Sequence, residues 1–351
     1  MEGSFSFQIY ILGEIIMKTF IPTDYKATRS LRETEEAIRD IRDIFQIELA
    51  EKLNLLRVTA PLFVKKSSGF NDNLNGVERP VAFETKEEPD EDLQIVHSLA
   101  KWKRFALKRY GFKMGEGLFT NMNAIRRDED TDNLHSIYVD QWDWEKIIAK
   151  EDRTTEFLKK TVKDIYSAMK ITGKKVAKKY GDVFEFPEDI YFVTSEELEA
   201  RWPELTAKER EDRICEEYKA VFVMHIGGKL PLSGEPHDLR APDYDDWKLN
   251  GDLLFWNPVL KCAFEVSSMG IRVDEEVLKR QLTLTDTLDR LELPFHKMLM
   301  DGELPYTIGG GIGQSRFCML LLKKAHIGEV QVSVWPEETI KECEAGGIHL
   351  L

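Results

Sequence analysis

The chain has 351 residues, and its 63 Asp and Glu against 49 Lys and Arg give a formal net charge of −14 at pH 7. This acidic balance argues against binding of nucleic acid through general electrostatics, because neutralising phosphates needs clustered Lys and Arg. A hydrophobic content of 42% can build a sizeable core, which excludes wholesale disorder. The longest apolar run, residues 317–322, is far shorter than the roughly 20 residues that cross a bilayer, so a membrane protein is excluded.

The N-terminal stretch and the cysteines indicate a cytoplasmic protein. A secretory signal peptide starts with basic residues, but no Lys or Arg precedes the partly apolar residues 5–17. Residues 1–16 are therefore interpreted as a dispensable leader, and residues 17–351 as a single domain. The cysteines lack the close spacing of a metal site and are expected to be reduced, buried thiols. They are Cys215, Cys262, Cys318 and Cys343.

The first predicted helix starts near Ser30, where apolar residues recur every three or four positions among charges. These are Ile38, Ile41, Phe45, Leu49 and Leu53. A strand-like stretch follows from residue 55 and stops at Pro61, because proline has no N–H for ladder pairing. Residues 68–76 are rich in Gly and Asn and predict a loop.

The middle of the chain predicts short strands at residues 81–84 and 93–96, then a helix at 99–110. A strand pair follows at 121–125 and 137–144, around a charged loop. The long helix over about 155–180 has one apolar stripe, so its lysines are interpreted as a solvated face rather than an RNA contact.

The C-terminal half continues with strands in runs and helices between them. Helices are predicted at residues 195–201, 206–219 and 273–290, strands at 220–225, 252–257 and 262–267, and a strand-to-helix passage at 305–324. The first of these helices starts with the capping-box spacing of residues 194–197. Because regular β-α-β alternation is missing, the pattern favours an α+β domain around a mostly antiparallel sheet.

One predicted strand carries polar residues where a core strand would not. Alternation along a strand from Ile137 sends Val139, Gln141, Asp143 and Glu145 to the same face. Three of these five residues are polar, which predicts that the face lines a cavity. A solvated sheet face is the alternative interpretation.

Two carboxylates and a glycine run add to this pattern. Asp252 and Glu265 lie on otherwise apolar strands, where a buried carboxylate is costly unless it is paired or bound to metal. Neighbouring strands that carry them would suit Mg²⁺, with structural ion pairing as the alternative.

A run of glycines permits close approach of the backbone to a flat or phosphate ligand, and Arg316 follows these glycines. They are Gly309, Gly310, Gly311 and Gly313.

Taken together, these segments resemble the catalytic domain of class II aminoacyl-tRNA synthetases. Residues 58–61 look like the first motif of that class, residues 126–145 like the second, and residues 309–316 like the third. Four further runs narrow the resemblance to the AMP-forming aspartate–ammonia ligase family, over about residues 17–335. They are residues 97–104, 138–145, 240–247 and 267–272.

The resemblance implies asparagine synthesis from aspartate, ATP and ammonia through a β-aspartyl-adenylate, with release of AMP and pyrophosphate, by a homodimer. Arg126 would contact the α-phosphate, and Arg316 the triphosphate tail and adenine. The backbone of Gly309, Gly310, Gly311 and Gly313 would border adenine and ribose. Asp252 and Glu265 would hold Mg²⁺ between the phosphates.

The resemblance also implies the aspartate site. Lys103 and Arg272 would face the carboxylates of aspartate, although a lone lysine at a helix start lies on the surface by default. The remaining assignments are Asp143 and Gln141 for the α-ammonium group, Ser267 and Ser268 for a carboxylate, and either Asp72 or Asp245 for ammonium or its proton. Glutamine-hydrolysing enzymes often carry a nucleophilic cysteine at the mature N-terminus. Here Glu2 follows Met1, and Lys18 follows Met17, which could be the true start, so free ammonia is the expected nitrogen donor.

Two alternatives remain open at this point. An aspartyl-tRNA synthetase-like enzyme would share aspartate adenylation, although the acidic balance disfavours tRNA. A catalytically inactive synthetase-like binding or regulatory protein would have lost residues such as Arg126, Glu265 and Arg316, all of which are present.

Overall fold

A computed structural model of the chain describes residues 11–12, 15–16, 19–72, 74 and 78–351. Most of the proposed leader and part of the predicted loop at 68–76 lie outside the described residues. Within the described part, a short pair of strands, β1 (Ile11–Leu12) and β2 (Ile15–Ile16), precedes the main body. No helix in these ranges is long and apolar enough to cross a membrane.

An eight-stranded sheet organises the fold, with the order β3-β7-β8-β13-β12-β11-β10-β9. The six central strands pair antiparallel, and only the edge strands β3 and β9 pair parallel with their neighbours. The prediction of an α+β domain around a mostly antiparallel sheet is therefore confirmed. The strands are β3 (Leu55–Arg57), β7 (Gly117–Ile125), β8 (Tyr138–Ile147), β9 (Tyr191–Thr194), β10 (Ala220–Met224), β11 (Asp245–Asn257), β12 (Cys262–Arg272) and β13 (Thr307–Gly313).

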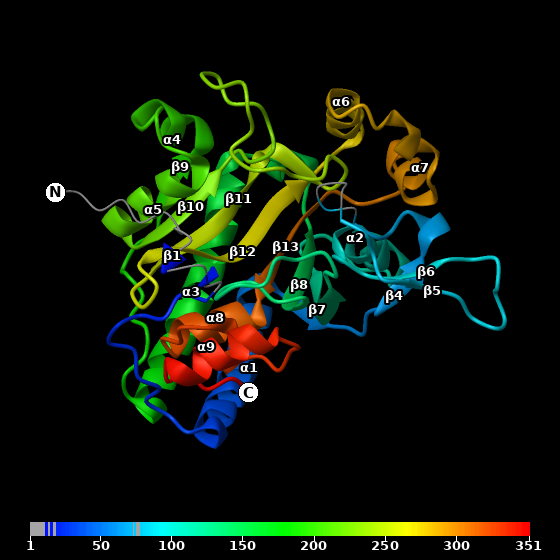
Figure 1. The fold of residues 1–351 in the computed structure, drawn as a ribbon. Coiled ribbons are helices and arrows are strands. Elements are labelled where there is room, and N and C mark those ends of the chain that lie inside the picture. Colours follow the sequence, from blue (N-terminus) through cyan, green and yellow to red (C-terminus); the bar gives the residue numbers. More distant parts are fainter. Residues whose placement is uncertain (1–10, 13–14, 17–18, 73, 75–77) are drawn as a thin grey trace.

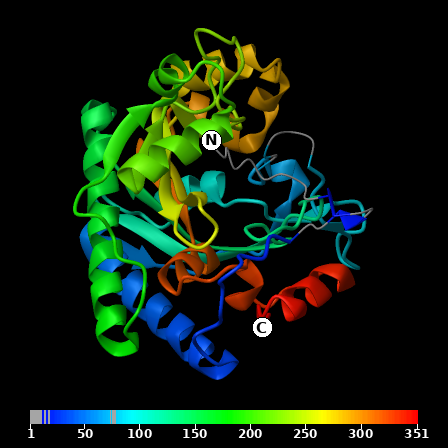
Figure 2. The same cartoon turned by 60° about the vertical axis from the view of Figure 1, so that its left-hand side comes forward.

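Two long helices, α1 (Leu31–Leu53) and α3 (Thr155–Tyr180), run side by side along one face of this sheet (Figures 1 and 2). Both begin at a hydroxyl side chain, because Ser30 and Thr154 accept the backbone N–H of the third helical residue. The shorter helix α8 (Gln314–Leu321) contacts α1 and the strands β8 and β13. The predicted helices at 155–180 and near Ser30 are confirmed.

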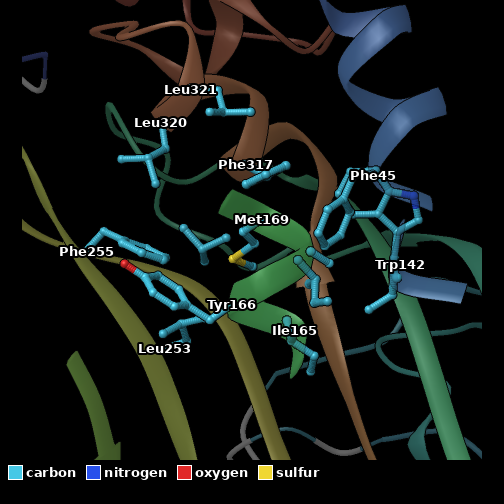
Figure 3. Packing of buried hydrophobic residues seen from close by; sticks show 14 of the residues in the cluster. Phe45, Trp142, Ile165, Tyr166, Met169, Leu253, Phe255, Phe317, Leu320 and Leu321 are labelled. Carbon is cyan, nitrogen blue, oxygen red and sulfur yellow. The ribbon is translucent and has the colours of Figure 1, made fainter. Parts of the chain in front are cut away.

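The main hydrophobic core fills the space between these helices and the sheet (Figure 3). Phe45 of α1 packs against Trp142 of β8 with ring centroids 4.6 Å apart, and Phe317 of α8 lies 4.7 Å from Phe45. Since Trp142 and Trp144 point into this core, alternation sends Gln141 and Asp143 to the opposite face of β8. The predicted division of this strand into an apolar and a polar face is confirmed.

The opposite side of the sheet is covered by shorter elements. Helix α2 (Ala100–Arg109) contacts β7, β8 and β13, and a small sheet of β4 (Phe63–Lys65), β6 (Leu93–Ile95) and β5 (Ala82–Phe83) lies beside it (Figure 1). The remaining helices are α4 (Ser195–Arg201), α5 (Ala207–Tyr218), α6 (Glu275–Leu284), α7 (Pro294–Met300) and α9 (Glu337–Ala345). The short 3₁₀ helices are η1 (Lys66–Ser68), η2 (Lys150–Asp152), η3 (Leu288–Glu292) and η4 (Ile327–Glu329).

Several boundaries differ from the sequence prediction. Strand β11 begins seven residues before the predicted 252, and β12 extends to Arg272, because both extensions carry polar side chains that hydrophobicity does not mark. The predicted helix at 273–290 ends at Leu284 and resumes as η3, after Asp286 takes a left-handed φ of 54°. β9, α7 and α9 were not predicted.

Candidate active site

A polar cavity of about 440 Å³ lies on the face of the sheet to which Gln141 and Asp143 point. It is lined by residues of α2, β8, β12 and β13 and of the loops around Asp72 and Arg240. Most predicted site residues therefore meet in one place. Those lining the cavity are Asp72, Lys103, Arg126, Gln141, Asp143, Asp245, Glu265, Ser268, Arg272, Gly310, Gly311, Gly313 and Arg316.

Lys103 is one of the most deeply buried residues of the site, with 1% of its side chain exposed. Its Nζ donates to the backbone oxygen of Gly310 at 3.0 Å and lies 3.1 Å from Oδ1 of Asp143. The surface position expected by default for a lone lysine is therefore wrong. Burial lowers the pKa of Lys103, while the carboxylate of Asp143 opposes that shift.

Arg272 lies between two carboxylates. Its Nε and Nη2 donate to Glu145, with Nη2 2.7 Å from Oε2, and its Nη1 donates to Oδ1 of Asp245. Burial would raise the pKa of Glu145, but the charge and hydrogen bonds of Arg272, together with Lys103 and Thr307, outweigh it and hold that pKa below its usual value. Burial also raises the pKa of Asp245, against the effect of Arg272. Glu145 therefore fixes Arg272, a role that was not predicted from the sequence.

The glycines of β13 make room for the polar side chains of β8. Gly309, Gly311 and Gly313 are paired with Glu145, Asp143 and Gln141. A Cβ on Gly311 would lie 2.9 Å from Oδ1 of Asp143, and one on Gly309 would overlap the Glu145 carboxylate. Gly309 itself is not among the cavity-lining residues, so its function in this structure is to accommodate Glu145 rather than to border a ligand.

The two predicted nucleotide-binding arginines are more accessible than Lys103 and Arg272. The side chain of Arg126, at the loop after β7, is 30% exposed and that of Arg316, in α8, is 25% exposed. Nη1 of Arg316 donates to the backbone oxygen of Glu265 at 3.0 Å, and Nη1 of Arg126 is 3.8 Å from Glu129. The buried Nε of Arg126 has no hydrogen-bond partner among the described residues.

The proposed metal ligands lie on adjacent strands, Asp252 on β11 and Glu265 on β12. Arg240 pairs with Oδ2 of Asp252, whereas Oδ1 is buried without a hydrogen-bond partner in the described part of the chain. Burial raises the pKa of Asp252, Arg240 opposes the shift, and Glu265 adds to it. Asp252 is buried just behind the cavity lining with one unpartnered oxygen, whereas the partly exposed Glu265 lines the cavity, and two such carboxylates on adjacent strands fit a divalent cation.

Such a cation would need other ligands as well. Among the described residues, no group of three or more His, Cys, Asp or Glu side chains is placed to hold a metal. Mg²⁺ commonly takes one or two carboxylates and completes its shell with water and substrate phosphates, which is the situation that Asp252 and Glu265 offer.

The two predicted serines differ in their environment. Ser268 lines the cavity, whereas Ser267 is 1% exposed and its Oγ donates to the backbone oxygen of Gly311 at 2.9 Å. Ser267 therefore joins β12 to β13 and does not face the cavity.

Asp72 is buried and lines the cavity, and its Oδ1 accepts the backbone N–H of Leu74 at 2.9 Å. Burial raises the pKa of Asp72, Lys101 opposes this, and Asp243 adds to it. Asp243 accepts from Lys101 at 3.0 Å and lies 3.0 Å from Nε2 of His296. This buried cluster was missed from the sequence, although residue 243 falls within a family-like run.

The fold is that of a class II aminoacyl-tRNA synthetase-like catalytic domain. The asparaginyl-tRNA synthetase of Entamoeba histolytica in complex with asparaginyl-adenylate superposes with a TM-score of 0.60 at 13% identity, covering 86% of this chain and 66% of that one. The Pyrococcus horikoshii asparaginyl-tRNA synthetase, also with asparaginyl-adenylate, gives 0.55 at 13% identity over 87% and 70%. These similarities show the fold.

The chain belongs to the aspartate–ammonia ligase family. The family model described as aspartate-ammonia ligase matches residues 32–347. An aspartate–ammonia ligase of Lactobacillus johnsonii is 64% identical over 336 residues, 95% of this chain and 100% of the relative. One from Clostridium perfringens strain SM101 is 64% identical over 335 residues, 95% and 99% of the two chains. The chain is thus a ligase that makes asparagine from aspartate, which decides against both alternative functions.

Proposed function

We propose that this cavity joins ATP and aspartate into a β-aspartyl-adenylate and that ammonia then displaces AMP. The observation that carries the proposal is that one cavity is lined by two pairs of cations that differ in burial. Lys103 and Arg272 are almost fully buried, which suits the carboxylates of a small amino acid, whereas Arg126 and Arg316 are partly exposed, which suits a larger nucleotide.

In the first step, an oxygen of the aspartate β-carboxylate bonds to the α-phosphorus, and the bond from that phosphorus to pyrophosphate breaks. Charge builds on the α-phosphate oxygens, which Arg126 is assigned to stabilise, while Arg316 is assigned to the triphosphate tail and adenine. The backbone of Gly310, Gly311 and Gly313 borders the nucleotide. Mg²⁺ held by Asp252 and Glu265 would neutralise phosphate charge when bound.

Aspartate is assigned to the buried part of the cavity. Asp143 and Gln141 accept from the α-ammonium group, Lys103 and Arg272 pair with the carboxylates, and Ser268 donates a further hydrogen bond. Asp143 already pairs with Lys103, so both are held in place before substrate arrives. This preorganisation supports selection of a doubly negative amino acid.

In the second step, ammonia attacks the acyl carbon and AMP leaves. The nitrogen must first lose a proton, because NH₄⁺ is not a nucleophile. Burial raises the pKa of both Asp72 and Asp245, but Asp245 is committed to Arg272, so Asp72 suits this role better. Asp72 is therefore our assignment for the group that receives ammonium.

The assembly is proposed to be a cytoplasmic homodimer that acts without nucleic acid. Among the described residues, β3 is an edge strand that pairs with β7 alone in the main sheet, and it carries Leu56 with 61% of its surface exposed. Leu62 and Phe63, just after Pro61, are exposed as well. An apolar sheet edge of this kind favours burial against a second copy. All four cysteines are buried and unpaired, in keeping with a reducing compartment.

The proposal is tested by incubating the purified chain with Mg-ATP, aspartate and ammonium chloride. Asparagine and AMP should appear in equal amounts. Formation of ADP instead of AMP, or a requirement for tRNA, would contradict the adenylate mechanism. Arg126→Ala and Arg316→Ala should each remove activity while circular dichroism stays unchanged, and near-normal turnover in either would refute its phosphate assignment.

A further inference from the structure

Arg240 forms an ion pair with the carboxylate of Asp252, one of the two proposed metal ligands. It precedes β11 and lines the cavity, and its Nη2 donates to Oδ2 of Asp252. Nη1 lies 3.5 Å from Oδ2 of Asp238. The side chains of Arg240 and Asp252 are 16% and 5% exposed, so the pair is largely shielded from water. The guanidinium thus supplies the positive charge that the buried carboxylate of Asp252 requires.

Three carboxylates act on this one guanidinium. Burial alone would lower the pKa of Arg240, but Asp252, Asp238 and Glu265 outweigh it and raise that pKa. Glu265 also lies 3.9 Å from Nη1 of Arg316. Arg240 and Arg316 thus each lie beside one of the two carboxylates that a divalent cation would use.

A divalent cation and the guanidinium of Arg240 would compete for the negative charge of Asp252. Oδ1 of Asp252 is buried without a hydrogen-bond partner among the described residues, so a cation has an oxygen available. A cation at Oδ1 would repel the guanidinium held at Oδ2, because both charges are positive and poorly screened. Phosphate oxygens of an incoming nucleotide would attract the same guanidinium, whose fork matches them.

We propose that Arg240 is a third nucleotide-binding arginine, which neutralises Asp252 in the free enzyme and moves to the triphosphate when Mg-ATP binds. This inference rests on the proposed magnesium-nucleotide site. The exchange keeps charge balanced throughout, since the metal takes over the carboxylates as the guanidinium leaves them. It also links metal and nucleotide binding, because each ligand favours the arrangement that the other requires.

The test measures metal binding without nucleotide. Free Mn²⁺ is followed by electron paramagnetic resonance for wild type, Arg240→Gln and Arg240→Lys. Arg201→Gln is the matched control, because Arg201 forms an exposed pair with Glu217 at 2.6 Å outside the cavity. Arg240→Gln should bind Mn²⁺ about tenfold more tightly than wild type, since the competing charge is gone. Arg240→Lys and Arg201→Gln should match wild type.

Nucleotide binding is measured next, by calorimetry with Mg-ATP. Arg240→Gln should weaken ATP binding by about 10- to 100-fold, and Arg240→Lys by less, because lysine keeps the charge and loses the fork. The lysine variant keeps the proposal testable if the glutamine variant does not fold. A merely structural role for Arg240 would weaken Mn²⁺ and ATP binding together, which overturns the proposal.

Two further outcomes separate this inference from the metal site itself. Unchanged Mn²⁺ affinity in Arg240→Gln, or ATP binding as tight as that of wild type, would overturn the role of Arg240 alone. Unchanged Mn²⁺ affinity in Asp252→Asn would overturn the metal site and this inference together. Loss of Mn²⁺ binding in Asp252→Asn, with a gain in Arg240→Gln, would support both.

Discussion

Glu145 accepts a hydrogen bond from Nη2 of Arg272 at 2.7 Å, and the two side chains are 0% and 3% exposed. Their strands, β8 and β12, are not neighbours, because β13 lies between them. The contact crosses β13 at Gly309, where a Cβ would lie 2.6 Å from Nη2 of Arg272. A glycine of the third synthetase-like motif thus permits an ion pair that holds a proposed aspartate-binding arginine.

Replacing Glu145 with Gln should impair aspartate binding selectively, because Arg272 loses the carboxylate that orients it. Breaking a buried ion pair costs about 3–5 kcal/mol of unfolding free energy, and we expect a loss in that range. The KM for aspartate should rise by about tenfold or more, with little change in the KM for ATP. Urea unfolding and steady-state kinetics measure the two effects.

The matched control for this variant is Glu36→Gln, which removes an exposed pair with Arg32 at 3.2 Å and should change neither quantity. Equal increases in the KM values for ATP and aspartate would show that Glu145 supports the whole cavity rather than Arg272.

Adding one methyl group at Gly309 should destabilise the protein through overpacking. The new Cβ would overlap the Glu145 carboxylate, and such changes in a packed interior cost about 1–3 kcal/mol. Chemical unfolding of Gly309→Ala measures the cost, and Glu145→Asp in the same chain should recover part of it by withdrawing the carboxylate. Gly228→Ala, whose Cβ would meet nothing within 4 Å, serves as the control. An unchanged unfolding midpoint for Gly309→Ala would contradict the finding that the Glu145–Arg272 pair passes directly over Gly309.

His326 should make stability depend on pH. Its Nδ1 accepts the N–H of Gly328 at 3.0 Å, which requires a neutral ring, and burial lowers its pKa from 6.5 to about 4. As pH falls through 6.5, the unfolded chain takes up a proton before the folded chain does, so stability falls toward pH 4. The full loss is about 3 kcal/mol.

The measurement is the urea midpoint between pH 7 and pH 4 for wild type, His326→Asn and His349→Asn. Asparagine retains an acceptor for Gly328 without titrating, so His326→Asn should flatten the pH dependence. His349 is exposed, and its replacement should leave the wild-type slope. If both variants keep that slope, His326 is not its source.

The dimer proposal predicts that a charge on the exposed edge strand separates the subunits. Leu56→Asp places a carboxylate on β3, where a second copy would have to bury it at a cost of several kcal/mol. Sedimentation should therefore show a dimer for wild type and a monomer for the variant. Leu284→Asp, at a residue 70% exposed on α6, should remain dimeric. A monomeric wild type would refute the proposed assembly.

Much of the fold follows from local patterns. The apolar spacing of α1 and α3 predicted both helices, and the alternation along β8 predicted the polar face that lines the cavity. The polar ends of β11 and β12 were missed because the residues that extend them, among them Asp245 and Arg272, satisfy each other inside the protein. A hydrophobic pattern identifies buried strand residues only when their side chains are apolar, and it misses buried polar residues that pair with each other.

For the candidate site, the sequence indicated which residues take part, and the structure showed the environment of each side chain. Family-like runs singled out Lys103, Arg126, Arg272 and Arg316, and the structure brings all four to one cavity. The environment of each side chain did not follow from these runs. Ser267 and Gly309 lie beside the cavity and support it, and the role of Glu145 in holding Arg272 emerged only from the structure.

The sequence by itself determined the class of fold, the family and the chemical types gathered in the site, because motifs and periodicity are local properties of the chain. Only the tertiary structure decided which charges pair. Glu145 and Arg272 are 127 positions apart, and their contact depends on the order of the strands and on the missing side chain of Gly309. Arg240 meets Asp252 because the loop before β11 folds back over that strand. Electrostatic partners are set by distance and desolvation, and these are properties of the folded chain.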